Sequence, residues 1–430
     1  MKKLLSTIME YFQNFSENKI EDIEIKNVQM DTRKVEDGTL FFAINGGNRY
    51  VGEALEKGAS LVIGDDIPTE FKENSRVIEV KDSVIAMQEL SNLYRRALNL
   101  KVIGITGSNG KTTTKDLLHG VLQEKYTTEK TQGNYNNHIG LPFTLLSLKE
   151  STEVAVLEMG MSGFGEIDAL CKIAEPDCGI ITNIGDSHLE FLKNRENVFK
   201  AKGEMIKYIS PENLFVFGDD PFLESVDAIK VGFEKENTYV LSQVEESSEG
   251  AIFNLNGEKY RINLNGEHNC INSGLAIAVG EKFGLNKTQI QEGLLKSSLS
   301  AMRFEKIKRG NHLYINDAYN ASPVSMRYSL ETFSNLEKSG KRVAVLGDML
   351  ELGEHELEYH RAVVERALEL DIDEIYLYGP RMEKIYEMLD NSKLHFFKEK
   401  SQIAVELSKL DEAMVLLKGS RGMKLEEIIK

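Results

Sequence analysis

The 430-residue sequence has little cysteine, little proline and no long apolar run. Its three cysteines, Cys171, Cys178 and Cys270, are too few and too irregularly spaced for a disulfide framework or a cysteine metal site, so we expect reduced thiols. No segment approaches the ~18 apolar residues that a membrane-spanning helix needs. Glu10 interrupts the short apolar stretch near the start, and no small-residue cleavage site follows it, which argues against a signal peptide. We therefore expect a cytoplasmic protein without membrane insertion.

Basic charge is also in deficit. There are 52 lysines and arginines against 68 aspartates and glutamates, so the formal net charge is −16. Such an excess of negative charge disfavours nonspecific binding to nucleic acids or to anionic membranes. Hydrophobic residues make up 41% of the chain, which is ordinary for packed cores. At roughly 150 residues per domain, the length predicts a globular protein of several domains. The net negative charge predicts no nucleic-acid partner.

Alternating strand and helix patterns predict an α/β protein. Apolar runs rich in β-branched residues predict strands at 101–106, 153–159, 178–184 and 214–218, and their continuity is typical of parallel strands covered on both faces. The alternation restarts in the last third, with strands predicted at 313–316, 342–347 and 374–379 and helices between them. This restart indicates a second, doubly wound domain. Residues 1 to about 98 carry shorter strands and predict a third, smaller mixed α/β domain.

The predicted strand at 101–106 runs into Gly107, Ser108, Asn109, Gly110, Lys111 and Thr112, and a helical pattern follows. A strand, a glycine-rich loop and a helix form the context of a phosphate-binding loop, in which backbone amides point at phosphate. Lys111 would neutralise the β and γ oxygens of a nucleotide, and the Thr112 hydroxyl is placed to hold Mg²⁺. The strict motif has a glycine where Ile105 stands. The alternative is a glycine-rich turn with an exposed lysine, which the flanking strand and helix disfavour.

Three further side chains are candidates for metal chemistry. Glu158 ends the predicted strand at 153–159, and the carboxyl end of a parallel strand beside a phosphate loop is where a Mg²⁺ ligand belongs, although a solvated glutamate is the alternative. His188 follows the next strand and could reach a second divalent ion, or it could be a polar loop residue. Lys200 and Lys202 lie close together in a helical stretch, and composition does not choose between them.

Together these residues resemble the ATP-dependent Mur ligase superfamily, and within it the members that add a dipeptide. The resemblance covers nearly the whole chain and follows the family's order. It is carried by segments 31–46, 105–115, 131–142, 157–167, 182–192, 201–206, 268–278, 303–305, 316–326, 346–353 and 416–423. The segments LGDMLELG at 346–353 and NDAYNASPVSM at 316–326 are particular to the dipeptide-adding members.

The resemblance implies three domains: a UDP-sugar domain (1–98), a central P-loop ATPase with a parallel sheet (99–302) and a C-terminal Rossmann-like domain (303–430). It implies an enzyme that uses ATP to join D-alanyl-D-alanine to the terminal carboxylate of UDP-N-acetylmuramoyl-tripeptide through an acyl phosphate, in peptidoglycan precursor synthesis. Two Mg²⁺ ions and a carbamate on Lys202 are implied as well. We expect a monomer.

The resemblance also implies roles for individual residues. Lys111, Glu158, His188, Lys202 and Arg303 would be catalytic, with Thr112 and Glu158 on one metal ion and His188 and carbamylated Lys202 on the other. Other residues would bind the nucleotide: Gly107, Ser108, Asn109, Gly110, Thr112, Thr113, Asn183, Asn269, Asn272 and Asp317. The substrates would contact Thr32, Arg33, Asn134, Asn136, Asn137 and Asn320. Asn269 and Asn272 are one helical turn apart, so both amides should face one side, toward adenine.

The chain departs from the family pattern in two places, and two other functions remain possible. His138 stands where an acidic residue is more usual, and NRYVGEAL follows Gly47 in place of an aspartate-glycine-histidine turn. One alternative function is another amino-acid-adding ligase of the same superfamily, such as a single-residue Mur ligase or a folylpolyglutamate synthetase. The other is an ATP-dependent switch that has lost ligation.

Overall fold

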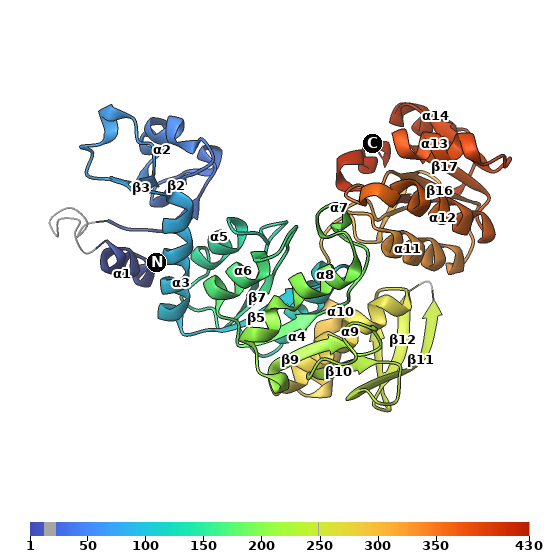
Figure 1. The fold of residues 1–430 in the computed structure, drawn as a ribbon, viewed down its shortest axis with the longest axis horizontal. Coiled ribbons are helices and arrows are strands. Elements are labelled where there is room, and N and C mark those ends of the chain that lie inside the picture. The colour runs from blue at the N-terminus through green and yellow to red at the C-terminus, as the bar shows by residue number, and fades with distance from the viewer. Residues whose placement is uncertain (13–22, 248, 430) are drawn as a thin grey trace. The chain divides into compact units, whose positions relative to one another are not determined.

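The computed structural model describes residues 1–12, 23–247 and 249–429. Figure 1 shows its ribbon. The chain divides into two compact units. The first contains residues 1–106, 125–180 and 204–214, and the second contains residues 107–124, 181–203 and 215–430. In the described ranges, no helix combines the length and the apolar character that crossing a bilayer requires.

A parallel four-stranded sheet, in the order β1-β2-β3-β4, lies near the start of the first unit. Its core is apolar because β2 is buried along its whole length and β3 along nearly all of it. The elements of this part are α1 (Lys2–Tyr11), β1 (Asn27–Gln29), β2 (Thr39–Ala43), α2 (Val51–Glu56), β3 (Ala59–Gly64) and β4 (Val77–Glu79). The α/β character predicted for the N-terminal part is confirmed, while its extent as a separate domain stays a prediction.

Helix α3 (Ser83–Leu98) packs against α5 (Gly140–Leu146) and α6 (Glu166–Ala174), as Figure 1 shows. The side chain of Asp82 caps its N-terminus by accepting hydrogen bonds from the next backbone amides. Tyr94 donates to the carbonyl of Leu148 at 3.0 Å, and Arg95 pairs with Asp177 at 3.0 Å. The helix before our proposed boundary at residue 98 is therefore anchored on elements that follow that boundary.

The first unit also contains the strands in the order β8-β5-β7-β6, with β5–β7 and β6–β7 parallel. Their bounds are β5 (Lys101–Thr106), β6 (Thr128–Lys130), β7 (Val154–Glu158) and β8 (Cys178–Ile181). The strands predicted at 101–106 and 153–159 are confirmed, the second within one residue at each end. The strand predicted at 178–184 stops at Ile181, because Thr182 and Asn183 bond to the phosphate loop instead.

The second unit contains helices that frame the phosphate loop, followed by five strands. The first of these strands confirms the one predicted at 214–218, and the other four were not predicted. Helix α4 (Lys111–Gln123) packs against α9 (Glu267–Lys282) and α10 (Lys287–Lys296). Two short helices, α7 (Leu189–Leu192) and α8 (Arg195–Lys202), precede the strands. The strands are β9 (Leu214–Phe217), β10 (Ile229–Gly232), β11 (Tyr239–Ser247), β12 (Gly250–Leu255) and β13 (Glu258–Ile262), of which β11, β12 and β13 pair antiparallel.

The C-terminal sheet has the order β14-β15-β19-β16-β17-β18, parallel except for its edge strand β14. Alternate residues of β16 enter different cores: Ala344 and Leu346 face α11 to α13, whereas Val343 and Val345 face α14. The elements are β14 (Glu305–Arg309), β15 (His312–Asn316), α11 (Pro323–Asn335), β16 (Lys341–Gly347), α12 (Glu356–Glu369), β17 (Glu374–Tyr378), α13 (Pro380–Met388), β18 (Leu394–Phe397), α14 (Lys400–Ser408) and β19 (Ala413–Lys418). Helices on both faces confirm the predicted doubly wound domain.

Candidate active site

The phosphate loop has the geometry that its glycines predict. It connects β5 to α4, and Gly107 and Gly110 have φ angles of +143° and +82°, which disfavour residues with a Cβ. The Lys111 ammonium lies over the loop and donates to the carbonyl of Gly107 at 2.7 Å and to that of Ser108 at 3.3 Å. The loop therefore holds a cation over backbone at the N-terminus of a helix, where anions bind well.

Gly107→Ala should weaken nucleotide binding at least about tenfold, or by about 1.4 kcal/mol, in calorimetric titration with ADP. A Cβ at this position would lie 1.9 Å from the Thr182 hydroxyl, so the loop would have to move. Gly257→Ala is the matched control, because Gly257 also has a positive φ, of +80°, but nothing lies within 4 Å of its Cβ position. Equal ADP affinities for the two variants would contradict this account of the loop.

The segment after β8, residues 182–188, is bonded to the phosphate loop. Thr182 donates to the Asn109 carbonyl at 2.6 Å, and Asn183 forms two hydrogen bonds with the Asn109 backbone, each of 3.0 Å. The Ser108 hydroxyl accepts hydrogen bonds from the Gly185 amide at 2.8 Å and from the Ser187 hydroxyl at 3.0 Å. The predicted nucleotide residues Ser108, Asn109 and Asn183 thus form one hydrogen-bonded cluster.

The remaining residues of segment 182–188 are held by hydrogen bonds to residues outside the phosphate loop. The Ile184 amide donates to Asp220 at 2.7 Å, and Arg195 donates to Asp186 at 2.7 Å. His188 has a left-handed φ of +55°, and its Nδ1 lies 2.8 Å from Oε2 of Glu351. The hydrogen bond with His188 holds the pKa of the Glu351 carboxyl below its usual value. Glu351 was not predicted as a site residue, although it lies within LGDMLELG.

Burial distinguishes the two lysines that the sequence left open. Lys202, at the end of α8, is only 1% exposed, whereas the Lys200 side chain is 57% exposed and pairs with Glu196. Burial, and then the positive charge of Lys111, lower the pKa of Lys202 well below its usual value. A lower pKa increases the fraction of neutral amine, which is the form that reacts with CO₂. Lys202 is therefore the lysine whose environment suits carbamylation.

Glu158 and Asn136 contact each other in the first unit. Glu158 is buried at the end of β7, and its Oε1 accepts a hydrogen bond from the Asn136 side chain at 2.9 Å. The Asn136 carbonyl also accepts from the Gly160 amide at 2.8 Å. The asparagine-rich loop that was predicted to bind the substrate is thus hydrogen-bonded to Glu158, the carboxylate that was predicted to bind the metal.

Asn269 and Asn272 face one side of α9, as their spacing predicted. Their side chains are buried and hydrogen-bond each other at 3.3 Å. Asn272 also accepts from the Thr114 hydroxyl at 3.2 Å, and it occupies the place where a Cβ of Gly110 would be. The pair therefore packs against the phosphate loop at Gly110. Its predicted contact with adenine stays a prediction.

Arg303 connects the C-terminal part of the second unit to the phosphate loop. Its Nη2 donates to the Thr112 hydroxyl at 3.0 Å, and its guanidinium stacks on the Tyr319 ring at 4.0 Å from the centroid. Ser322 donates to the Asn109 side chain at 3.0 Å. The contacts of Arg303 with Thr112 fit its predicted place at the γ-phosphate. Sequence reasoning did not identify Tyr319 or Ser322 individually, although both lie in NDAYNASPVSM.

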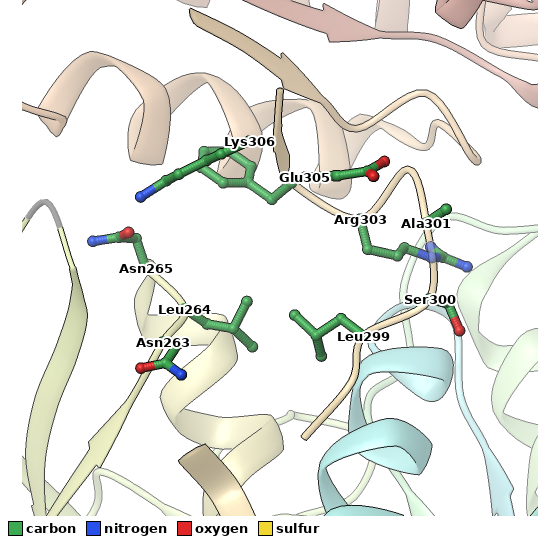
Figure 2. Close-up of a pocket in the computed structure, with 10 residues that line it drawn as sticks. Asn263, Leu264, Asn265, Leu299, Ser300, Ala301, Arg303, Glu305 and Lys306 are labelled. Atoms are coloured by element: carbon green, nitrogen blue, oxygen red, sulfur yellow. The ribbon is translucent and has the colours of Figure 1, made fainter. Parts of the chain in front are cut away.

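A cavity of about 300 Å³ lies beside Arg303 within the second unit, between the start of α9 and the segment that leads into β14. Leu264 and Leu299 point toward one another across it, and Lys306 extends on the side of Asn265 (Figure 2). Asn265 is buried, and its carbonyl accepts a hydrogen bond from Asn269. This volume is at the lower end of the range for small-molecule pockets.

Asp317 forms a buried ion pair that the sequence did not reveal. Its Oδ2 lies 2.7 Å from the ammonium of Lys418, and its Oδ1 accepts from the Phe304 amide at 3.2 Å. Burial lowers the pKa of Lys418, while Asp317 opposes that shift. Asp317 is thus held in place beside Arg303. The sequence offered one clue to this pair: the segment LLKGSRGM contains Lys418, to which the sequence analysis assigned no partner.

The predicted substrate residues are spread over several surfaces. Thr32 is buried and Arg33 is exposed beside Asp31, with which it pairs at 2.8 Å. Asn134 is exposed, Asn137 accepts from the Gly140 amide at 2.9 Å, and Asn320 accepts from the Ala321 amide at 2.9 Å. Thr113, which was predicted to bind the nucleotide and not the substrates, is partly buried in the first turn of α4. The exposed asparagines are available to a ligand.

The candidate metal ligands offer a hydroxyl, a carboxylate and an imidazole, supplied by Thr112, Glu158 and His188. Among the described residues, no three His, Cys, Asp or Glu side chains gather as a metal-binding group. The proposed ligand set does not require such a group, because a carbamate on Lys202 would supply further oxygen ligands. The oxygens of Thr112, Glu158 and a Lys202 carbamate are hard ligands that suit Mg²⁺, and His188 would add one nitrogen ligand.

Comparisons with known proteins show the family to which the chain belongs. The Mur ligase middle domain family matches residues 105–280, and the Mur ligase, glutamate ligase domain family matches residues 302–421. The chain belongs to the Mur ligase family. Within it, the chain is 40% identical to the UDP-N-acetylmuramoyl-tripeptide--D-alanyl-D-alanine ligase of Bacillus subtilis (strain 168), over 100% of this chain and 98% of that protein.

Solved structures point to the same branch of the family. A crystal structure of MurF from Acinetobacter baumannii has a TM-score of 0.87 and 29% identity, and the alignment covers 100% of this chain and 97% of that one. MurF ligase from Thermotoga maritima in complex with ADP has a TM-score of 0.83 and 28% identity, covering 95% and 97% of the two chains. These relatives favour the dipeptide-adding branch over the single-residue and folate alternatives.

Proposed function

We propose that this protein joins D-alanyl-D-alanine to the terminal carboxylate of UDP-N-acetylmuramoyl-tripeptide, using ATP. The relatives with that name align over the full chain, and the ADP complex of one of them supports ATP as the phosphoryl donor. The observation in this chain that carries the proposal is the buried Lys202 amine with its depressed pKa, since such an amine suits a carbamate.

The reaction needs activation because a carboxylate is a poor electrophile in water. Transfer of the γ-phosphoryl group from ATP to the substrate carboxylate would give an acyl phosphate and ADP. The dipeptide amine would then attack the acyl carbon, forming the amide and releasing phosphate. Mg²⁺, when bound by Thr112, Glu158, His188 and carbamylated Lys202, would offset the negative charge of the two reacting anions.

The chain's own residues would position the reactants. The phosphates would lie on the amides of residues 107–112, with the Lys111 and Arg303 cations on the β and γ oxygens. The cavity beside Arg303 is the space that we assign to adenosine, with Asp317 toward the ribose. Asn136, bonded to Glu158, would place the substrate carboxylate near the metal. Such positioning supplies much of the catalysis in phosphoryl transfer.

Phosphate release distinguishes this function from the alternatives. The purified protein with ATP, Mg²⁺ and UDP-N-acetylmuramoyl-tripeptide should release phosphate on addition of D-alanyl-D-alanine, and the mass of the nucleotide product should increase by the dipeptide residue. Single amino acids in its place should give no release, and neither should folate with glutamate. Release with a single amino acid would assign the chain to another ligase of the superfamily. Release with no acceptor would support an ATPase switch.

A further inference from the structure

The backbone bonds of segment 182–188 fix the position of His188, whereas the orientation of its imidazole ring depends on a contact with Glu351. The backbone of segment 182–188 is bonded to the phosphate loop through the Gly185 amide and to Asp220 through the Ile184 amide. His188 itself has a left-handed backbone at the N-terminus of α7. Its imidazole forms a hydrogen bond of 2.8 Å between Nδ1 and Glu351. Rotation of the ring is therefore restrained from the C-terminal part of the second unit.

Glu351 is well placed to restrain the ring because the loop that carries it is held residue by residue. Buried Asp348 accepts from the Met382 amide at 3.0 Å, and the Met349 amide donates to Nε2 of His360 at 2.8 Å. The Leu350 amide donates to the Ser420 hydroxyl at 2.9 Å. These bonds account for much of the LGDMLELG segment: its first residues build a rigid support, and Glu351 follows directly.

Glu351 itself is bonded at two points. Its backbone carbonyl accepts a hydrogen bond from the Glu190 amide at 3.2 Å. Its carboxylate contacts His188, which precedes Glu190 by two residues. A carboxylate accepts hydrogen bonds, so the neutral imidazole must carry its proton on Nδ1 to satisfy this contact. The lone pair is then on Nε2, the atom left to bind a cation.

We infer that Glu351 is a positioning residue, which holds His188 in the Nδ1–H form and directs Nε2 toward the second divalent cation. The inference rests on the proposed role of His188 as a metal ligand. Histidine ligands commonly donate their other ring N–H to a carboxylate, and loss of such a partner typically lowers metal affinity about 10- to 100-fold. The segment LGDMLELG would then orient a metal ligand in addition to packing in the C-terminal sheet.

The first test reads the tautomer without metal. In ¹⁵N-labelled protein, a His188→Asn variant assigns the His188 ring signals. The neutral imidazole should carry its proton on Nδ1 in the wild type and in Glu351→Gln, whose amide oxygen still accepts. In Glu351→Ala the Nε2–H form should appear. An unchanged tautomer in Glu351→Ala would overturn the inference.

The second test measures cation binding, with Mn²⁺ as the probe and ADP present, by electron paramagnetic resonance. Glu351→Ala should bind the His188-dependent Mn²⁺ at least about tenfold more weakly than the wild type, and Glu351→Gln should recover part of the loss. Glu354→Gln is the matched control, because Glu354 is an exposed glutamate of the same loop. It should bind Mn²⁺ as the wild type does.

Two outcomes would overturn the inference while leaving the proposed ligation intact. One is equal Mn²⁺ affinity in Glu351→Ala and the wild type. The other is a His188→Asn variant that binds Mn²⁺ undiminished, which would remove His188 from the metal site. Phosphate release that depends on the dipeptide would persist in the wild type in either case, so failure of the inference is distinguishable from failure of the function. Thermal unfolding of each variant identifies any loss that is due to misfolding.

Discussion

Lys202→Met is expected to abolish ligation while making the folded protein more stable at neutral pH. Loss of the carbamate would remove a metal ligand that contributes several kcal/mol to the transition state, so dipeptide-dependent phosphate release should fall at least about 10³-fold. The stability gain follows from burial, because the charged form of Lys202 is disfavoured in the fold. Phosphate release and urea unfolding in CO₂-depleted buffer measure the two effects.

The sign of the pH dependence follows from the direction of the pKa shift. The pKa of Lys202 is lower in the folded chain than in the unfolded one, so the unfolded state binds more protons between the two values. The wild-type free energy of unfolding therefore includes a term that increases with pH across that interval, up to the ordinary pKa of lysine. Lys202→Met should lack this term.

Lys200→Met is the matched control for Lys202→Met, since it removes an exposed lysine from the same helix. Its phosphate release should equal that of the wild type. A carboxylate resembles a carbamate, so acetate or formate should restore part of the activity to the smaller variant Lys202→Ala. Wild-type phosphate release by Lys202→Met would contradict the carbamate proposal.

Much of the fold follows from local patterns in the sequence. Continuous apolar runs predicted β5, β7 and β9, and in the C-terminal sheet β15, β16 and β17. The strand-loop-helix order predicted the phosphate loop. The antiparallel strands β11 to β13 were missed. Much of β11 is exposed, so it has no continuous apolar run to distinguish it from a polar connection.

Motifs in the sequence proposed residues for the site but could not predict the contacts that these residues make. Motifs selected His188 and Asp317, yet their partners Glu351 and Lys418 are more than a hundred residues away along the chain. Local pattern carries no information about such pairs, which arise only when the C-terminal sheet forms. Composition did not choose between Lys200 and Lys202. The resemblance implied Lys202, and its burial, which is a property of the packed helix, supplies the physical reason.

Lys111→Met should weaken ATP binding and also shift carbamylation of Lys202 to higher pH. A hydrogen bond to a charged group contributes about 1.5–3 kcal/mol, so ATP affinity should fall roughly 10- to 100-fold. Lys111 also lowers the pKa of Lys202, so its removal raises that pKa and leaves less neutral amine at a given pH. The ¹³C signal of protein equilibrated with ¹³C-bicarbonate should therefore show a higher carbamylation midpoint by pH titration.

Lys111→Arg separates the two effects of Lys111. It keeps the positive charge near Lys202, so the carbamylation midpoint should stay close to that of the wild type. The planar guanidinium is larger than the ammonium that now donates to the Gly107 and Ser108 carbonyls, so ATP affinity should still fall. An equal upward shift of the midpoint in both variants would show that loop geometry, rather than the charge of Lys111, sets the reactivity of Lys202. Charge as the cause requires a shift in the methionine variant alone, because only that variant removes the cation whose repulsion disfavours protonation of the buried amine.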